Sequence, residues 1–206
     1  MVPDFDAARA YGLDRLEREL APFLAYHNLW HTRDEVLPRA VWLARRLGVN
    51  GCDLQLVQLG AVYHDIGFTV TTDEHECAGS HIAAEVLPRF GLSLAHVAAV
   101  QSMIMATKLP QSPHNLLEQI VADADLDSLG RDDFVPRSHA LRRELESRGM
   151  PSTDEQWYER QLAFLEGHRF FTSAARELRD DGEWSNTELT RRLLAEARNG
   201  RRRPPG

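Results

Sequence analysis

A histidine–aspartate pair, His64-Asp65, is the feature of this sequence with the clearest chemical meaning. Another histidine, His31, precedes the pair, and two aspartates, Asp123 and Asp125, follow it, all within segments that have a helical pattern. Imidazole nitrogens and carboxylate oxygens together suit divalent ions such as Zn, Mn, Fe, Ni or Mg. Two histidines and two carboxylates leave coordination positions open for water and substrate, whereas a structural zinc site is closed by four protein ligands. The set therefore predicts a catalytic metal site.

The segment before the pair carries two histidines, His27 and His31, four residues apart. On a helix they would lie one above the other on the same face. One imidazole could then bind the metal while the other lies beside the substrate. Asn28, between them, is predicted to be structural, because an Asn side chain can tie local backbone groups.

The pair itself is predicted to lie at the end of an apolar helix. Gly67 is placed where a helix C-cap commonly needs a left-handed residue. At such a terminus the adjacent side chains of His64 and Asp65 can converge on one ion.

Periodicity does not choose between the two downstream aspartates. On a helix Asp123 and Asp125 lie about 200° apart, at roughly 100° per residue. The apolar stripe lies between them, and each aspartate flanks one edge of it. Either could therefore reach a metal.

These residues resemble the HD superfamily of metal-dependent phosphohydrolases. The order His31, His64-Asp65, Asp125 looks like that superfamily's ligand set, and YHNLWH is similar to the Tyr-His-Asn-x-x-His motif of its cyclic-nucleotide phosphodiesterases. EHECAGSHIAAEVL resembles the helix that follows the pair, and VADADLDSLG the segment that supplies the last aspartate. The resemblance spans roughly residues 20–130. The remainder to about 197 looks like the helical extension of small stand-alone bacterial HD proteins.

The resemblance implies a compact, all-α, multi-helix HD-domain fold like that of the phosphodiesterases. It implies four metal ligands, His31, His64, Asp65 and Asp125, because the ligand in the family pattern is the aspartate that follows Ala and precedes Leu. Asp123 is then expected to orient a ligating histidine. The ion expected is Mn, Mg, Fe, Co, Ni or Zn.

A second metal is less well supported by the family pattern. His75-Glu76-Cys77-Ala78-Gly79 is similar to the His-x-x-x-Gly pattern that can bind a second ion in two-metal HD proteins. The paired histidines that usually complete such a site are absent, and residues 106–108 read Ala-Thr-Lys instead. We therefore expect one tightly held ion, with His75 or Glu76 near the substrate.

The expected chemistry is hydrolysis of a phosphomonoester or phosphodiester, with a nucleotide as substrate, by a metal-activated water. Asp65 ligates and also accepts a proton from that water, His27 donates a proton to the leaving oxygen, and Lys108 is a candidate phosphate anchor. Two alternatives stay open. One is a cyclic-nucleotide phosphodiesterase, and the other is a regulatory module that binds metal or nucleotide without turnover.

Composition is that of an ordinary globular protein, with 43% hydrophobic and 27% charged residues. The net charge of −7 argues against binding a nucleic-acid polymer, because its phosphate backbone would be repelled, whereas a small anionic phosphorylated substrate remains compatible. Cys52 and Cys77 have no metal-binding spacing, so a reduced cytoplasmic location is expected. We expect no secretory signal and no membrane span.

The chain is predicted to be helical throughout as one HD-type domain over residues 1–198. Its core is expected at about 20–130 and a helical C-terminal extension at about 131–198, followed by a basic flexible tail at 199–206. Helix starts are predicted at Ser93, Ser112-Pro113, Thr153 and Ser185, and breaks near Gly48–Gly51, Gly149 and Asp181-Gly182. Five other histidines lack a chemical context and are expected at the surface or core edge: His81, His96, His114, His139 and His168.

Overall fold

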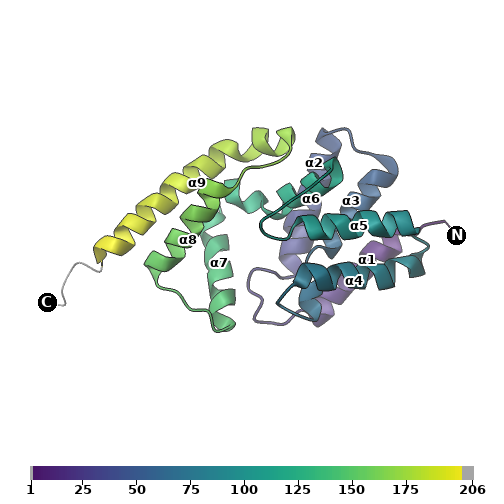
Figure 1. The fold of residues 1–206 in the computed structure, drawn as a ribbon, viewed down its shortest axis with the longest axis horizontal. Coiled ribbons are helices and arrows are strands. Elements are labelled where there is room, and N and C mark those ends of the chain that lie inside the picture. Colours follow the sequence, from purple (N-terminus) through teal and green to yellow (C-terminus); the bar gives the residue numbers. More distant parts are fainter. Residues whose placement is uncertain (1, 201–206) are drawn as a thin grey trace. The chain divides into compact units, whose positions relative to one another are not determined.

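The structure, a computed structural model, describes residues 2–200 and confirms the all-α prediction. Within those residues there are nine α-helices and no strand (Figure 1). The helices are α1 (Phe5–Glu19), α2 (Leu37–Arg46), α3 (Gly51–Tyr63), α4 (His75–Val86), α5 (Leu94–Ala106), α6 (Leu116–Asp125), α7 (Phe134–Ser147), α8 (Asp154–Gly167) and α9 (Ser173–Gly200). A π-helical turn, η1 (His31–Val36), leads into α2, and three 3₁₀ turns connect other helices: η2 (Ile66–Thr69), η3 (Leu87–Phe90) and η4 (Asp127–Gly130).

The chain divides into two compact units, of which one ends at Leu126 and the other begins at Asp127. The first unit contains α1 to α6, and the second contains η4 and α7 to α9. The boundary falls close to the predicted junction between core and extension at about residue 130. That both parts act as a single domain stays a prediction. Helix α9 includes the first two residues of the predicted tail, and residues 201–206 lie outside the described residues.

Helix α3 is the centre of the first unit. It packs against α1, α2, α5 and α6, and its second half, from Leu56 to Tyr63, is buried except for Gln58. A helix that is apolar on all sides is a core helix rather than a surface helix. Because His64 and Asp65 follow directly after α3, the best-packed element of the unit determines where they lie.

Helix α1 holds the end of α3 that leads to this pair. A Cβ atom on Gly12 would lie only 2.6 Å from Cγ1 of Val62, so glycine is what allows the two helices to approach this closely. The hydroxyl of Tyr63, buried in this contact, donates to the carbonyl of Ala8 at 2.9 Å. A buried polar group with its partner in place favours one position of the helix end.

One predicted helix start in the first unit is confirmed and another is wrong. Ser93 caps α5 by accepting from the backbone N–H of His96 at 3.2 Å. Helix α6 starts at Leu116 rather than after Ser112-Pro113, because the Asn115 side chain accepts from the backbone N–H groups of Leu117 and Glu118. Asn is as good an N-cap as Ser, so the later of two competing caps prevails here.

In the second unit, the predicted capping box at Thr153 is confirmed at the start of α8. The break predicted at Asp181-Gly182 and the helix start at Ser185 are wrong, because α9 continues through both. A Cβ atom on Gly182 would lie 2.1 Å from the carbonyl oxygen of Gly130, so this glycine permits close packing on η4. The Ser185 hydroxyl donates to the carbonyl of Asp181 within the helix at 2.9 Å.

His168 of the second unit is buried rather than at the surface, with 9% of its area exposed. Its Nδ1 atom lies 2.6 Å from Oε1 of Glu183, which is also buried, and its ring contacts Phe170 edge-on. Residues 2–200 contain no helix with the length and apolar character that a membrane crossing requires.

Candidate metal centre

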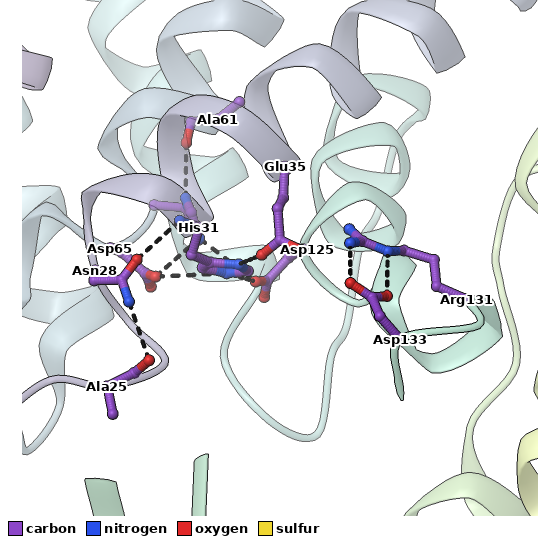
Figure 2. Close-up of polar contacts among 10 residues, drawn as sticks. Ala25, Asn28, His31, Glu35, Ala61, Asp65, Asp125, Arg131 and Asp133 are labelled. Carbon is purple, nitrogen blue, oxygen red and sulfur yellow. Dashed lines mark hydrogen bonds and ion pairs between the residues drawn. The ribbon is translucent and has the colours of Figure 1, made fainter. Parts of the chain in front are cut away.

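Four side chains of the first unit converge at one point, and Figure 2 labels three of them, His31, Asp65 and Asp125. Nε2 of His31 lies 3.2 Å from Oδ1 of Asp125 and 3.8 Å from Oδ2 of Asp65. Nε2 of His64 lies 3.1 Å from the same Asp65 oxygen and 3.4 Å from the same Asp125 oxygen. Three of the four residues, His31, His64 and Asp65, are almost fully buried, and each offers a ligand atom within 4.8 Å of the others. The structure thus brings together all four predicted metal ligands.

The donor atoms fit a divalent cation. Nε2 of His64 and Oδ2 of Asp65 are buried and have no hydrogen-bond partner among residues 2–200, although they lie 3.1 Å apart. Buried polar atoms without partners are costly and rare. A cation between them would satisfy both atoms, and a mixed nitrogen and oxygen set suits the ions named above.

The π-helical turn η1 carries His31 into the cluster. Leu37 donates its N–H to the carbonyl of Thr32, five residues earlier, and Pro38 follows directly. Proline has no N–H and clashes with the carbonyl four residues before it, so a regular α-helix is disfavoured at this point. Single π-helical turns of this kind are frequent at functional sites.

His27 does not lie on this helix, which corrects the prediction that it stacks one turn before His31. Helical structure begins at Leu29, and His27 lies in the preceding bend. Asn28 ends the bend as a cap: its side chain accepts from the His31 N–H at 3.1 Å and donates to the Ala25 carbonyl at 3.0 Å. The side chain of Asn28 thus caps the helical structure that begins after it, and His27 lies outside that structure.

The imidazoles of His31 and His64 are oriented through their Nδ1 atoms. Nδ1 of His31 lies 3.1 Å from Oε2 of Glu35, and Nδ1 of His64 donates to the Ala61 carbonyl at 2.7 Å. Both contacts leave Nε2 directed at the cluster. At these two nitrogens the contacts are with Glu35 and Ala61, and the orienting role of Asp123, which is buried in α6, stays a prediction. Glu35 was missed although its i+4 spacing from His31 was a usable signal.

Glutamine in place of Glu35 is expected to weaken metal binding about 10 to 100-fold, because carboxylates that orient a ligating histidine contribute on that scale. Isothermal titration with Mn²⁺ or Zn²⁺ measures the loss. Asp34→Asn is the matched control, since the adjacent carboxylate is paired with Arg33 at the surface and should leave the affinity unchanged. Equal affinities for Glu35→Gln and the unaltered protein would contradict the orienting role.

The two imidazoles and the two carboxylates of the cluster shift one another's pKa values. Burial lowers the pKa of His31, but hydrogen bonds to Asp125 and Glu35 outweigh it and leave that pKa raised. Burial also opposes charge on His64, yet Asp65 and Asp125 raise its pKa well above the usual value. Burial would raise the pKa of Asp65, but His64 and His75 hold it well below its usual range. In the same way, His31 and His64 lower the pKa of Asp125 against the effect of burial.

These shifts predict how the metal-free protein responds to pH. A raised folded-state pKa means that the stability contributed by His31 and His64 is complete below about pH 6.5 and is lost as the pH rises through the folded-state values. The thermal midpoint in EDTA should therefore fall as the pH rises above about 6.5, and the gain from added metal should grow in the same direction, because metal displaces protons. The fall should be smaller in His64→Gln, and an equal fall in both proteins would contradict this assignment.

His75 and Glu76 lie beside the cluster. Nε2 of His75 is 3.5 Å from Oδ1 of Asp65, and its Nδ1 is 3.5 Å from Oε2 of Glu76. The imidazole is partly exposed, with 19% of its side-chain area accessible, so it lies where the buried cluster meets the surface. Phe68, which the sequence did not single out, stacks on the same imidazole at 3.9 Å between ring centroids.

Gly67 has a different function from the left-handed C-cap predicted for it. Its φ is not positive, but a Cβ atom there would lie 1.8 Å from the carbonyl oxygen of His75 and 2.8 Å from the amide nitrogen of Gly79. The glycine therefore lets η2 approach the start of α4. This close approach brings His75 to Asp65.

Alanine at position 67 is expected to destabilise the protein by about 1–3 kcal/mol, as overpacking of a closed contact does. Urea unfolding followed by circular dichroism measures the change. Gly167→Ala is a suitable control, because nothing lies within 4 Å of a Cβ atom at that position. A loss no larger than in this control would mean that the backbone can move apart without cost.

Lys108, the chain's only lysine, lies outside the cluster and forms an ion pair with Glu74. Both side chains are substantially exposed, at 39% and 65%. Glu74 has a left-handed backbone, with φ of 51°, and directly precedes His75. The ion pair thus joins the end of α5 to the loop that leads to His75. The role of Lys108 as a phosphate anchor stays a prediction, in which phosphate would compete with Glu74.

Comparison with known proteins places this geometry in context. Residues 34–128 match the model of the HD domain family; the match begins three residues after His31 and includes the other three predicted ligands. The fold is similar to a crystal structure of a predicted HD superfamily hydrolase from an uncultured Thermotogales bacterium. The TM-score is 0.62 at 23% sequence identity, over 94% of this chain and 93% of that chain. No curated protein matches the chain.

Proposed function

We propose that this chain, of which residues 34–128 match the model of the HD domain family, is a metal-dependent phosphohydrolase. HD domains generally belong to enzymes of this kind. The observation that carries the proposal is the cluster itself, in which two imidazoles and two carboxylates converge. Nε2 of His64 and Oδ2 of Asp65 lie within ion-pair distance of each other but have no hydrogen-bond partner among the described residues.

His31, His64, Asp65 and Asp125 would hold the ion. A bound divalent ion polarises a phosphoryl oxygen and makes water a competent nucleophile near neutral pH. The substrate is a phosphomonoester or phosphodiester. Asp65 has a second task in the proposal, because its carboxylate accepts a proton from the attacking water.

His27 is proposed to donate a proton to the leaving oxygen. Its ring centroid lies 6.2 Å from that of His31, close enough to be beside a substrate that reaches the cluster. Its side chain is partly exposed, and imidazole can carry a proton near neutral pH. His75 or Glu76, both of which lie beside the cluster, is proposed to be near the substrate.

A nucleotide is the proposed substrate type. The Tyr-His-Asn-x-x-His motif, with His27 and His31 as its histidines, supports a cyclic-nucleotide phosphodiesterase as the second candidate. Within that motif Asn28 caps a helix, so this residue of the motif serves local structure rather than recognition of a base.

A substrate panel tests the proposal. Purified protein with added Mn, Mg, Co, Ni, Fe or Zn is incubated with nucleoside monophosphates, cyclic nucleotides and nitrophenyl phosphate esters, and product release is measured. Asp65→Ala is the matched control for a contaminating phosphatase. Turnover that the control lacks supports the proposal. Saturable nucleotide binding without turnover would instead indicate a regulatory module and would overturn it.

A further inference from the structure

We propose that Phe68 is a positioning residue for this activity, because it holds His27 and His75 as a pair at the edge of the metal cluster. The inference rests on the proposed function for its kinetic part. Its structural part, that one phenyl ring contributes to the orientation of two imidazoles, can be tested without any substrate.

The ring geometry is the main observation. The Phe68 ring stacks on His75 with centroids 3.9 Å apart and planes 21° apart, and on His27 with centroids 4.5 Å apart and planes 23° apart. The ring centroids of the two imidazoles are 6.1 Å apart. Phe68 is 5% exposed, whereas both imidazoles are partly exposed. A buried ring thus supports two imidazoles that a ligand can reach.

Local backbone structure does not by itself hold either imidazole. His27 lies in the bend before helical structure begins, and His75 is the first residue of α4, directly after the left-handed Glu74. Side-chain packing must therefore contribute to their orientation. Phe68 can supply it because its ring is buried and its backbone N–H donates to the carbonyl of the predicted ligand Asp65 at 3.0 Å, which ties its backbone to the cluster.

Position matters for what the two imidazoles are proposed to do. His75 already lies 3.5 Å from Asp65, and the proton donor His27 must reach the leaving oxygen of a substrate at the cluster. Displacement of a catalytic group by about 1 Å can reduce the rate about 100-fold. Loss of the phenyl ring should therefore reduce turnover although Phe68 itself carries no reactive group.

Kinetics provide the first arm of the test. Phe68→Leu is expected to lower kcat about 10 to 100-fold with metal content unchanged. Phe68→Tyr, which keeps the flat ring, should recover most of that loss. Phe90→Leu is the matched control, since it removes a ring contact with Tyr11 outside the cluster and should leave kcat within about twofold. Phe68→Met replaces the leucine variant if that variant does not fold. An unchanged kcat in the folded ringless variant would overturn the proposal.

The second arm separates positioning from general destabilisation. If Phe68 acts through His27 and His75, the leucine substitution should cost less than about twofold in a His27→Gln, His75→Gln background, because contacting residues are not additive. A full 10-fold or larger loss in that background would show that the ring acts by another route and would overturn the proposal.

The third arm needs no activity. NMR of histidine-labelled protein, assigned with His27→Gln and His75→Gln, reports the ring protons of both imidazoles, which the stacked phenyl should shift upfield. Phe68→Leu is expected to remove the shift from both, and Phe90→Leu from neither. Unshifted imidazole signals in the unaltered protein would overturn the placement. Shifts that behave as expected, together with no turnover on any substrate, would count against the proposed function and not against this placement.

Discussion

Alanine in place of Asp65 is expected to give a folded, helical protein that retains no metal ion and has lost phosphohydrolase activity by about 10³-fold or more. The carboxylate contributes Oδ2, which lies 3.1 Å from Nε2 of His64 and 3.8 Å from Nε2 of His31 and has no hydrogen-bond partner among residues 2–200. Without it the cluster loses one of its two carboxylates and the proposed proton acceptor together. Loss of several kcal/mol of polarisation by the ion corresponds to a factor of this size.

Elemental analysis and circular dichroism of the purified variant provide the measurement. Asp53→Ala is the matched control: this aspartate is exposed in the first turn of the same helix, α3, and should keep full metal content. Full metal content in Asp65→Ala would remove the central claim about the site.

Glutamine in place of His27 is expected to lower turnover about 10² to 10⁴-fold while metal content stays unchanged, because a positioned general acid contributes on that scale. His27 lies beside His31 but outside the set of four ligands, so it can act on the substrate without binding the ion. Steady-state kinetics on an alkyl phosphate ester, whose leaving group needs a proton, measure the loss.

A nitrophenyl ester should be much less affected by the same substitution, since its leaving group departs without a proton. His81→Gln, at an exposed position on α4, is the control and should leave both rates within about twofold. Equal losses on the two esters would identify His27 as a structural or binding residue.

The sequence alone determined the chemical identity of the site. The types and order of His31, His64, Asp65 and Asp125 indicated a metal centre, because imidazole nitrogens and carboxylate oxygens are donors that divalent metal ions prefer. It also determined the all-helical fold and local features such as the caps at Ser93 and Thr153, since an N-cap depends on a few neighbouring residues.

Features that depend on contacts between distant residues could not be derived in this way. Gly67 and Gly182 look like helix breakers in the sequence, but each permits close approach of another backbone. The stacking of Phe68 on His27 and His75 depended on three segments meeting. Tertiary packing decides such features because it determines which distant groups come within contact distance, and sequence spacing contains that information only within a helical turn or two.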